Sequence, residues 1–415
     1  MRVRLMVEVN IGKEVRNINE LERVVYGRMR EVGKELMVEV LRRAEKEAMR
    51  KVKGVKIGFG ESYWITRLGV VKIRKQRVRA KGKSFYPLDR YLGTERRGSE
   101  ATVWVKRRGV ELSCDYAYRK SAELLSREIG DWVSKSALHR WVQEAGERYC
   151  AKENLEWEGM IKRGEAPESF KEKKDLVVVE VDATSIARQR ERWGKEEQKS
   201  KLEVKLGVMY TGRESYGKGK NRLKDKVVYG GLEGAEEFGE KLWIKGEKKL
   251  KVSEARKQLL IGDGDVWIKE IKQANFPHAS YQVDWWHLTK KIREAMRKNE
   301  RLSRLLIRRL YEGKGATLVG LLERKIDRLT EEREEIDKLL GYLRHNQEGF
   351  YGSQELKGEI ADKVGSGAIE KNMELVVGRR FKKWGMSWSK PGAHYLLKLR
   401  LLKYDSEAWN DFWNN

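Results

Sequence analysis

The stretch Leu176-Val-Val-Val-Glu-Val-Asp182 is a nearly continuous apolar run that ends in a carboxylate. Such a run is typical of a sheet strand that is covered on both faces. A second apolar strand is predicted at Leu259-Leu-Ile261, directly before Gly262-Asp263-Gly264. Residues 202–210 alternate in polarity and residues 226–229 are briefly apolar, so both favour further strands. From residue 175 onward the chain is therefore predicted to be α/β, with two buried strands that each stop at an aspartate.

A third carboxylate, Glu370, opens a helical stretch in Gly365-Ser-Gly-Ala-Ile-Glu370. Between Asp263 and Glu370 the apolar residues recur with helical spacing, which predicts an all-helical insertion over about 286–362. Each carboxylate alone is an ordinary strand-end or helix residue, so the prediction depends on their combination. The order Asp–Asp–Glu is that of the retroviral-integrase fold. Residues 175–415 are accordingly predicted to form an RNase H-like catalytic domain.

These three carboxylates predict a metal site. Carboxylate oxygens are the ligands that Mg²⁺ and Mn²⁺ prefer in proteins. Two such ions can activate an attacking oxygen and stabilise a leaving oxygen at phosphorus. We therefore expect two Mg²⁺ or Mn²⁺ ions to be held by Asp182, Asp263 and Glu370.

The charge of the chain indicates the partner. Its 415 residues include 90 Lys or Arg and 64 Asp or Glu, for a formal net charge of +26. An excess of this size points to a polyanion, because neutralising phosphates releases condensed counterions. A basic surface kept for solubility is the alternative interpretation.

The remaining composition excludes several classes of protein. No apolar run approaches the ~20 residues of a membrane-spanning helix, and the charged start Met1-Arg-Val-Arg-Leu-Met6 does not resemble a secretory signal. Two cysteines without a Cys-x-x-Cys pair exclude a disulfide framework and argue against structural zinc. A protein of the reducing cytoplasm, without a membrane partner, is expected.

Upstream of residue 175 the pattern predicts three segments. Residues 1–110 are predicted to be an α+β region, with an amphipathic helix over 19–50 and strands over 55–79. Asn19 and Glu22 resemble a capping box at the start of that helix. Residues 111–151 are predicted to be a DNA-binding region. The charged residues 152–174, which include Gly164 and Pro167, are predicted to be a linker.

Within the second segment, residues 117–148 are predicted to form a helix-turn-helix. Gly130 would supply the turn and Ser134 would cap the second helix, with apolar residues packed inward at Leu138, Trp141 and Val142. The outward residues of a recognition helix would be Lys135, Ser136, His139 and Arg140. An ordinary helical hairpin within a core is the alternative.

Five short motifs follow one another in an order that resembles a known family. They are Val181-Asp182, Gly262-Asp263-Gly264-x-x-Trp267-Ile268, Asp284-Trp-Trp-His287-Leu288, Gly365-Ser-Gly-Ala-Ile-Glu370 and Arg380-Phe-Lys-Lys-Trp-Gly-Met386-Ser-Trp388-Ser389. Together with Pro87-Leu-Asp-Arg-Tyr-Leu-Gly93 and the helix-turn-helix, they resemble DDE transposases of the ISLre type. These are insertion-sequence enzymes related to the Mutator-like superfamily, and the resemblance extends from about residue 85.

The resemblance implies a function. Such an enzyme would bind the terminal inverted repeats of its element as double-stranded DNA, cleave the DNA, and join the freed 3′-hydroxyl to target DNA without a covalent enzyme intermediate. It would act on the nucleoid as a homodimer or higher oligomer. Asp284-x-x-His287 resembles a signature of these enzymes, which implies a catalytic role for His287 beside the metal site. A core histidine that donates to a backbone carbonyl is the alternative.

Some residues depart from the family pattern. Asp265 stands where a small residue is usual and is a rival ligand to Asp263, while Glu374 lies one helical turn after Glu370 and is a rival third ligand. The basic segment after Glu370 is predicted to contact phosphates and stack on bases. Its members are Arg379, Arg380, Lys382, Lys383 and Trp384.

Two other functions remain open from the sequence. A nuclease of the same fold would hydrolyse DNA without joining strands, and an assay with a 3′-hydroxyl end would separate it from a transposase. A catalytically inactive DNA-binding protein derived from a transposase would share the helix-turn-helix, although the presence of all three carboxylates argues against it.

Overall fold

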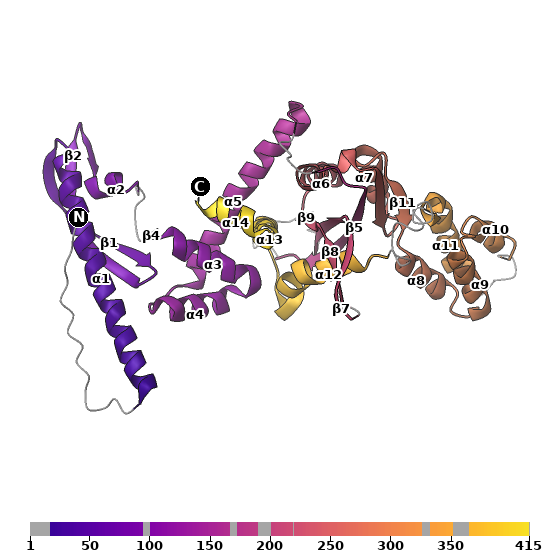
Figure 1. Ribbon diagram of the computed structural model, residues 1–415, viewed down its shortest axis with the longest axis horizontal. Helices are drawn as coiled ribbons and strands as arrows, with labels where there is room; N and C mark the ends of the chain where they lie inside the picture. Colours follow the sequence, from indigo (N-terminus) through magenta and orange to yellow (C-terminus); the bar gives the residue numbers. More distant parts are fainter. Residues whose placement is uncertain are drawn as a thin grey trace, which may run out of the picture. The chain divides into compact units, whose positions relative to one another are not determined.

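The computed structural model describes residues 17–93, 100–166, 172–189, 201–218, 220–325, 333–351 and 365–414 (Figure 1). The chain divides into two units, Met1–Glu144 with Trp409–Asn415 and Ala145–Ala408. The predicted helix-turn-helix region therefore belongs to the first unit up to Glu144. So do the last residues, which the sequence had assigned to the catalytic domain. Parts of the predicted linker and of the helical insertion, at 167–171, 326–332 and 352–364, lie outside the described residues.

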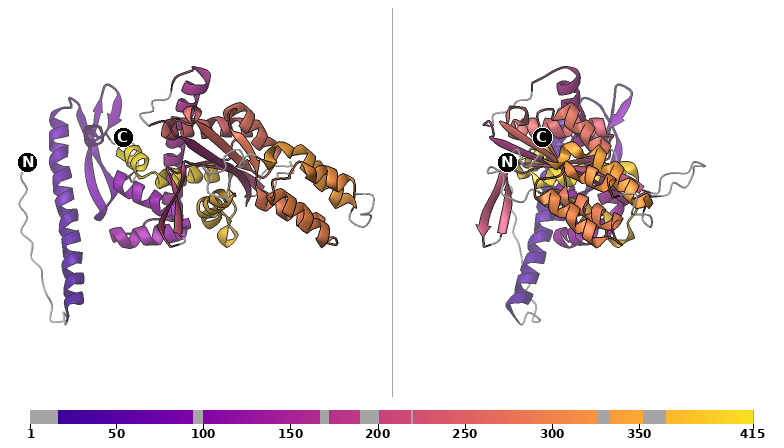
Figure 2. Two further views of the ribbon diagram at one scale, coloured as in Figure 1. Left: turned by 45° about the vertical axis from the view of Figure 1, so that its right-hand side comes forward. Right: turned by 90° about the vertical axis from the view of Figure 1, so that its right-hand side faces the viewer.

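The first unit begins with a helix on a small sheet. Helix α1 (Ile18–Arg50) packs on strands β1 (Val55–Thr66) and β2 (Gly69–Ala80), which confirms the helix and strands predicted for 19–50 and 55–79. Figure 2 shows α1 running beside this sheet. The sheet order is β3-β2-β1-β4, with β3 at Lys83–Phe85 and β4 at Glu100–Ala101. The core between helix and sheet contains Leu41, Val71, Ile73 and, from the short helix α2 (Pro87–Tyr91), Leu88.

The cap of α1 lies two residues earlier than predicted. Asn17, not Asn19, accepts the backbone N–H groups of Asn19 and Glu20, each at 3.0 Å. Asn17 has the extended backbone of a cap residue, with φ −153°. A cap needs that extended conformation to turn its side chain back on the first turn, and Asn19 is already helical.

Three helices complete most of the first unit. They are α3 (Val103–Asp115), α4 (Tyr118–Ile129) and α5 (Lys135–Trp157), of which α5 continues into the second unit. Gly130 ends α4 in the left-handed conformation, at φ +72°, and Ser134 Oγ accepts the Ala137 N–H at 3.0 Å. The turn and cap therefore form at the predicted residues, and the predicted inward residues Leu138, Trp141 and Val142 are buried.

Helix α5 also shortens the predicted linker. It runs to Trp157 and ends in a π-helical turn, Glu158–Lys162, so the first part of 152–174 is helical. The reason is packing in the second unit: Trp157 Nε1 donates to Glu240 at 2.7 Å and Lys241 donates to Asn154 at 2.7 Å. The first part of this charged segment, predicted as a linker, therefore packs against α6 within the second unit.

The second unit is built on a mixed five-stranded sheet in the order β11-β10-β5-β6-β9. Strands β5, β10 and β11 are parallel to one another, whereas β6 is antiparallel to β5 and β9 is antiparallel to β6. The strands span Leu176–Ala187 (β5), Lys201–Tyr210 (β6), Val227–Gly231 (β9), Lys257–Gly262 (β10) and Ser280–Val283 (β11). The mixed sheet confirms an α/β unit, although the sequence did not predict β11.

Helices connect the strands. Helix α6 (Ala235–Leu250) lies between β9 and β10 in the chain, and α7 (Val266–Asn275) lies between β10 and β11. A hairpin of β7 (Gly212–Gly217) and β8 (Lys220–Lys224) extends from the end of β6. None of the described helices combines the length and the apolar character that a bilayer crossing requires.

The helical insertion follows β11. Helices α8 (Trp285–Ala295), α9 (Glu300–Tyr311), α10 (Thr317–Glu323) and α11 (Arg333–His345) group beside that strand at one edge of the sheet (Figure 1). Their leucines join the same hydrophobic core as the strands. The chain then returns through α12 (Gly367–Met373), the π-helical segment η6 (Glu374–Lys382) and α13 (Lys390–Tyr404).

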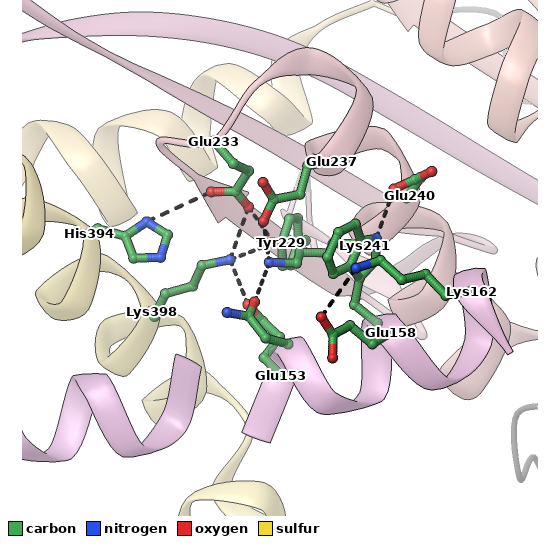
Figure 3. Close-up of polar contacts among 12 residues, drawn as sticks. Glu153, Glu158, Lys162, Tyr229, Glu233, Glu237, Glu240, Lys241, His394 and Lys398 are labelled. Carbon is green, nitrogen blue, oxygen red and sulfur yellow. Dashed lines mark hydrogen bonds and ion pairs between the residues drawn. The ribbon is translucent and has the colours of Figure 1, made fainter. Parts of the chain in front are cut away.

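A buried charge cluster joins α5, β9 and α13 within the second unit. The Lys398 ammonium lies 2.7 Å from Glu153 and 3.2 Å from Glu233, and it also contacts the Tyr229 hydroxyl (Figure 3). The Lys398 side chain is 1% exposed. Burial alone would raise the pKa of Glu233, but the charge of Lys398 and the hydrogen bond from Tyr229 outweigh it and lower that pKa to about 2. Two buried carboxylates are thus kept ionised by one buried cation.

Candidate active site

Three aspartates follow one another along the carboxyl edge of the parallel strands. Strand β10 pairs with β5 up to Ile261↔Glu180, and continuing that register by two residues places Asp263 beside Asp182. Asp284 directly follows β11, and its N–H donates to the Gly262 carbonyl at 2.7 Å. The carboxyl ends of parallel strands are where α/β sheets present their functional groups.

Strand β5 does not end at Asp182 as predicted. It continues to Ala187, because residues Asp182–Ala187 still pair with β6. What ends near Asp182 is the pairing with β10. At Asp182 the neighbouring strand β10 no longer pairs with β5, which leaves room for the Asp182 side chain. The end of a strand would have left the same room.

Burial, with a smaller contribution from neighbouring negative charge, raises the pKa values of the first two aspartates. Burial raises the pKa of Asp182 to about 6; the N–H of Ala183 opposes the change and the charge of Asp263 adds to it. Burial also raises the pKa of Asp263, against a hydrogen bond from the Asp265 N–H. Two partly buried carboxylates that repel each other are a setting that a cation would stabilise.

Asp284 holds His287 beside these carboxylates. Its carboxylate caps α8 by accepting the N–H groups of Trp286 and His287, and it lies 2.5 Å from His287 Nδ1. The hydrogen bond to Asp284 raises the pKa of His287, and the charges of Asp182 and Asp263 raise it further against burial. His287 therefore lies within the electrostatic reach of both aspartates, in surroundings that favour its protonated form.

Glu370 comes to the same region on α12. Its carboxylate accepts the Ser366 hydroxyl at 3.1 Å, and the Ser366 N–H lies 3.4 Å from Asp284 Oδ1. The Glu370 side chain is exposed. One serine thus connects the third predicted ligand to the Asp284–His287 pair.

Glu180 was missed by the sequence interpretation. It is fully buried, accepts the Tyr210 hydroxyl at 2.7 Å, and accepts the N–H of Ile369 at 2.7 Å. Ile369 directly precedes Glu370, so Glu180 attaches the first turn of α12 to β5 two residues before Asp182. The signal was visible as one carboxylate inside Val177-Val-Val-Glu-Val181, where a valine would fit the pattern.

A Glu180→Met variant is expected to slow the DNA cleavage proposed below by about 10²-fold. Methionine cannot accept the Ile369 N–H, so the start of α12 would lose its attachment to β5. A small displacement of a catalytic group can slow a reaction by this much. Cleavage rate and DNA affinity would be measured together, with affinity expected to stay near wild type.

Two companion variants identify the cause. Glu180→Gln can still accept the Ile369 N–H and should restore most of the rate, whereas Tyr210→Phe removes only the other hydrogen bond and should change the rate little. If Gln were as slow as Met, the charge of Glu180 and not its hydrogen bond to α12 would be responsible.

Tyr342 of the insertion was also missed. Its hydroxyl donates to the Asp263 carbonyl at 2.6 Å, and a Cβ at Gly264 would lie 2.8 Å from the same hydroxyl. Gly264 has φ +95°, a conformation that favours glycine. The insertion therefore holds the turn that carries Asp263. No local sequence pattern could have indicated a contact across 79 residues.

The described residues contain no group of three or more His, Cys, Asp or Glu side chains arranged to hold a metal ion. The donor chemistry nevertheless suits a hard divalent cation, because Asp182 and Asp263 lie on adjacent strands and a cation would relieve the repulsion between their carboxylates. Glu370 is connected to this region by its hydrogen bond with Ser366, but its carboxylate is not grouped with those of the aspartates.

The two rival ligands are placed differently. Asp265 is exposed, and its N–H donates to Asp263 at 3.0 Å, so it supports the conformation of Asp263. Glu374 is exposed and forms long ion pairs with Arg379, at 3.9 Å, and Lys383, at 3.8 Å. These placements favour Asp263 over Asp265, and Glu370 over Glu374, as residues of the predicted metal site.

The predicted DNA-contacting residues fall into two groups. Lys135, Ser136, His139 and Arg140 are all exposed on the first turns of α5. After Glu370, Arg379, Lys382 and Lys383 are exposed, and the side chain of Trp384 lies outside the described residues.

Arg380 is a correction to the prediction. It is 2% exposed, its guanidinium lies 4.9 Å from the Trp388 ring, and it contacts Met386 Sδ at 3.4 Å. The π-helical turn of η6 directs this arginine inward. Arg380 therefore packs in the interior beneath the basic segment and does not present a surface charge to DNA.

Fold and site define the chain as a mixed α/β protein with clustered carboxylates at one edge of its sheet. It belongs to the uncharacterised protein family UPF0236, whose family model matches residues 11–413. No curated protein matches the chain. Among solved structures, it is similar to the Drosophila P element transposase in its strand transfer complex, at 11% identity over 77% of this chain and 83% of that chain. The TM-score is 0.25, which is too low to establish a shared fold.

Proposed function

We propose that this protein is a DNA transposase of an insertion sequence, of the ISLre type, with an RNase H-like catalytic unit. The observation that carries the proposal is the alignment of Asp182, Asp263 and Asp284 on adjacent parallel strands at one edge of the sheet, with Glu370 connected to Asp284 through Ser366. If the five strands are numbered 1 to 5 in the order in which they follow one another in the chain (β5, β6, β9, β10, β11), their order across the sheet is 5-4-1-2-3. The second strand, β6, is antiparallel to the first. That arrangement supports an RNase H-like fold, in which an Asp–Asp–Glu set acts on phosphodiesters.

Asp182, Asp263 and Glu370 would hold two Mg²⁺ or Mn²⁺ ions. When bound, such ions activate an attacking oxygen and stabilise a leaving oxygen at phosphorus. The residues of the chain position this chemistry: Glu180 and Ser366 hold the start of α12, and Tyr342 holds the turn of Asp263. Catalysis by positioning and charge stabilisation is what phosphoryl transfer requires.

His287 would manage a proton at this site. Its Nδ1 contacts Asp284, so the imidazole ring is held in one orientation, and the protonated ring would donate from its other nitrogen. We infer that it protonates the leaving 3′-oxygen or contacts the scissile phosphate. Either role uses the raised pKa of His287.

DNA binding would use the two exposed basic groups. The first turn of α5 offers Lys135, Ser136, His139 and Arg140, which would read the terminal repeats in a major groove. The segment after Glu370 would hold phosphates beside the carboxylates with Arg379, Lys382 and Lys383. Assembly of both element ends would require a homodimer or higher oligomer.

The full chain is expected to nick a duplex carrying its element end, in Mg²⁺ or Mn²⁺, and to join the resulting 3′-hydroxyl to a second duplex. Labelled element-end DNA with the sequence that flanks the gene provides the substrate, and gel analysis separates nicked from joined products. A duplex of shuffled sequence is the control.

The two alternatives give different products. Cleavage without any joined product would identify a nuclease, and specific binding without cleavage in either metal would identify an inactive DNA-binding protein. Absence of both binding and cleavage would contradict the proposal itself.

A further inference from the structure

One face of the N-terminal sheet carries exposed aromatic rings. Helix α1 covers the other face, where Val71 and Ile73 pack against Leu41. On the open face, Phe59 is 58% exposed and Tyr63 is 37% exposed. Single exposed apolar residues are ordinary, whereas exposed rings grouped on one face can mark an interaction site.

A cation lies over each of these rings. The strand register pairs Tyr63 with Lys72, whose ammonium is 5.3 Å from the ring centroid. Arg74, one pair further along on the same face, lies 4.5 Å from the Phe59 centroid. On this face β1 presents Phe59, Glu61 and Tyr63, and Arg74 pairs with Glu61 across the two strands. The face therefore combines rings with charged side chains, which is a different arrangement from an apolar patch.

The charge around this face is strongly one-sided. Residues 55–91 contain ten Lys or Arg and two acidic residues. One of the two, Asp89, is buried and paired with Lys75 at 2.6 Å. Glu61 is thus the acidic side chain that remains to face solvent in this range, and the surface is complementary to a polyanion.

We propose that this face, which we call the β1–β2 platform (Phe59, Tyr63, Lys72 and Arg74), binds single-stranded DNA. Bases of a single strand expose their ring faces and can stack on Phe59 and Tyr63, while Lys72 and Arg74 move to the flanking phosphates. A duplex keeps its bases stacked on each other and would leave the rings unused. The inference rests on the proposed function for the identity of the nucleic acid as DNA, since cleavage and joining expose single-stranded ends.

The test measures binding of the full chain to a fluorescent single-stranded oligonucleotide across a salt series. Phe59→Ala with Tyr63→Ala should weaken binding by about tenfold for each ring and leave the salt slope unchanged. Lys72→Gln with Arg74→Gln should weaken binding and flatten the slope by about 0.7 for each phosphate that is no longer neutralised. All four side chains are exposed, and thermal unfolding would verify that the variants fold.

A matched control lies on α1. Tyr26 is 60% exposed and carries Arg30 at 5.0 Å from its ring, but it is not on the sheet. Tyr26→Ala should leave single-strand binding unchanged. An equal loss for Tyr26→Ala, or no loss for the paired Phe59 and Tyr63 substitution, would overturn the inference.

Duplex DNA and single-stranded RNA serve as the other ligands. The platform variants should bind duplex like wild type, whereas Arg140→Ala should weaken duplex and spare the single strand. Equal losses on both forms would make the platform a duplex contact, and a preference for RNA would contradict DNA as its ligand; either result overturns the inference. An Asp182→Asn variant should bind the single strand normally whether or not the protein cleaves DNA, so failure of the proposed activity is distinguishable.

Discussion

An Asp263→Asn variant is expected to lose DNA strand cleavage by at least about 10²–10³-fold, the size seen when one group that stabilises charge in the transition state is removed. Asparagine keeps the shape of the side chain and can still accept the Asp265 N–H, but a neutral amide cannot balance a divalent cation. DNA binding should stay near wild type because the substitution keeps the size of the side chain and removes none of the exposed basic residues proposed to contact DNA. Single-turnover cleavage of labelled duplex, with affinity measured in parallel, tests both parts.

Asp265→Asn is the matched control, since it changes the same charge two residues away in the same turn. Asp265 is exposed, and its contact with Asp263 is a hydrogen bond donated by its backbone N–H, which the substitution leaves in place. It should retain most of the activity. Loss of cleavage in Asp265→Asn with retention in Asp263→Asn would transfer the metal role to Asp265.

A Lys398→Met variant is expected to destabilise the second unit by roughly 3–5 kcal/mol, as breaking a buried ion pair usually does. Methionine fills a similar volume but leaves Glu153 and Glu233 buried without their cation. Thermal and denaturant unfolding at neutral pH would measure the change. Lys249→Met removes an exposed pair with Asp405 at 2.9 Å and should alter stability by only about 0–1 kcal/mol.

The pH dependence of the stability lost in Lys398→Met distinguishes unpaired buried charge from lost packing. In the wild type the pKa of Glu233 is lowered to about 2, so its stabilising contribution is present above about pH 4.3, the usual value for Glu, and is lost as the pH falls toward 2. Without Lys398, burial would raise the pKa of Glu233 above its unfolded value. The deficit of Lys398→Met should therefore be largest at neutral pH and shrink toward pH 4. A deficit that stayed constant over this range would indicate lost packing and not stranded charge.

Much of the architecture follows from local patterns. The apolar spacing of 19–50 predicted α1 to within one residue. The β-branched residues within 55–79 and the alternation in 202–210 predicted strands that form. Gly130 was correctly expected to end a helix, because a left-handed turn favours glycine. These features depend on neighbours in the chain, which a sequence records directly.

The errors have separate physical causes. Asn19 was predicted to cap α1, but Asn17 offers the same side chain and the backbone conformation decides between them. Arg380 was expected to contact DNA because its neighbours are basic, but a π-helical turn directs it inward. Strand β11 is four residues long, too short for a period to be recognised.

For the candidate site, the sequence by itself determined which residues can do the chemistry: two aspartates after apolar strands, an Asp-x-x-His pair and a helix glutamate. Only the tertiary structure decided how they meet. The parallel register of β5, β10 and β11 aligns Asp182, Asp263 and Asp284 at one edge, and Glu180 attaches α12 from 189 residues away. The physical reason is that a carboxylate's type is local information, whereas its neighbours, and therefore its pKa and its hydrogen bonds, are set by strand pairing and burial.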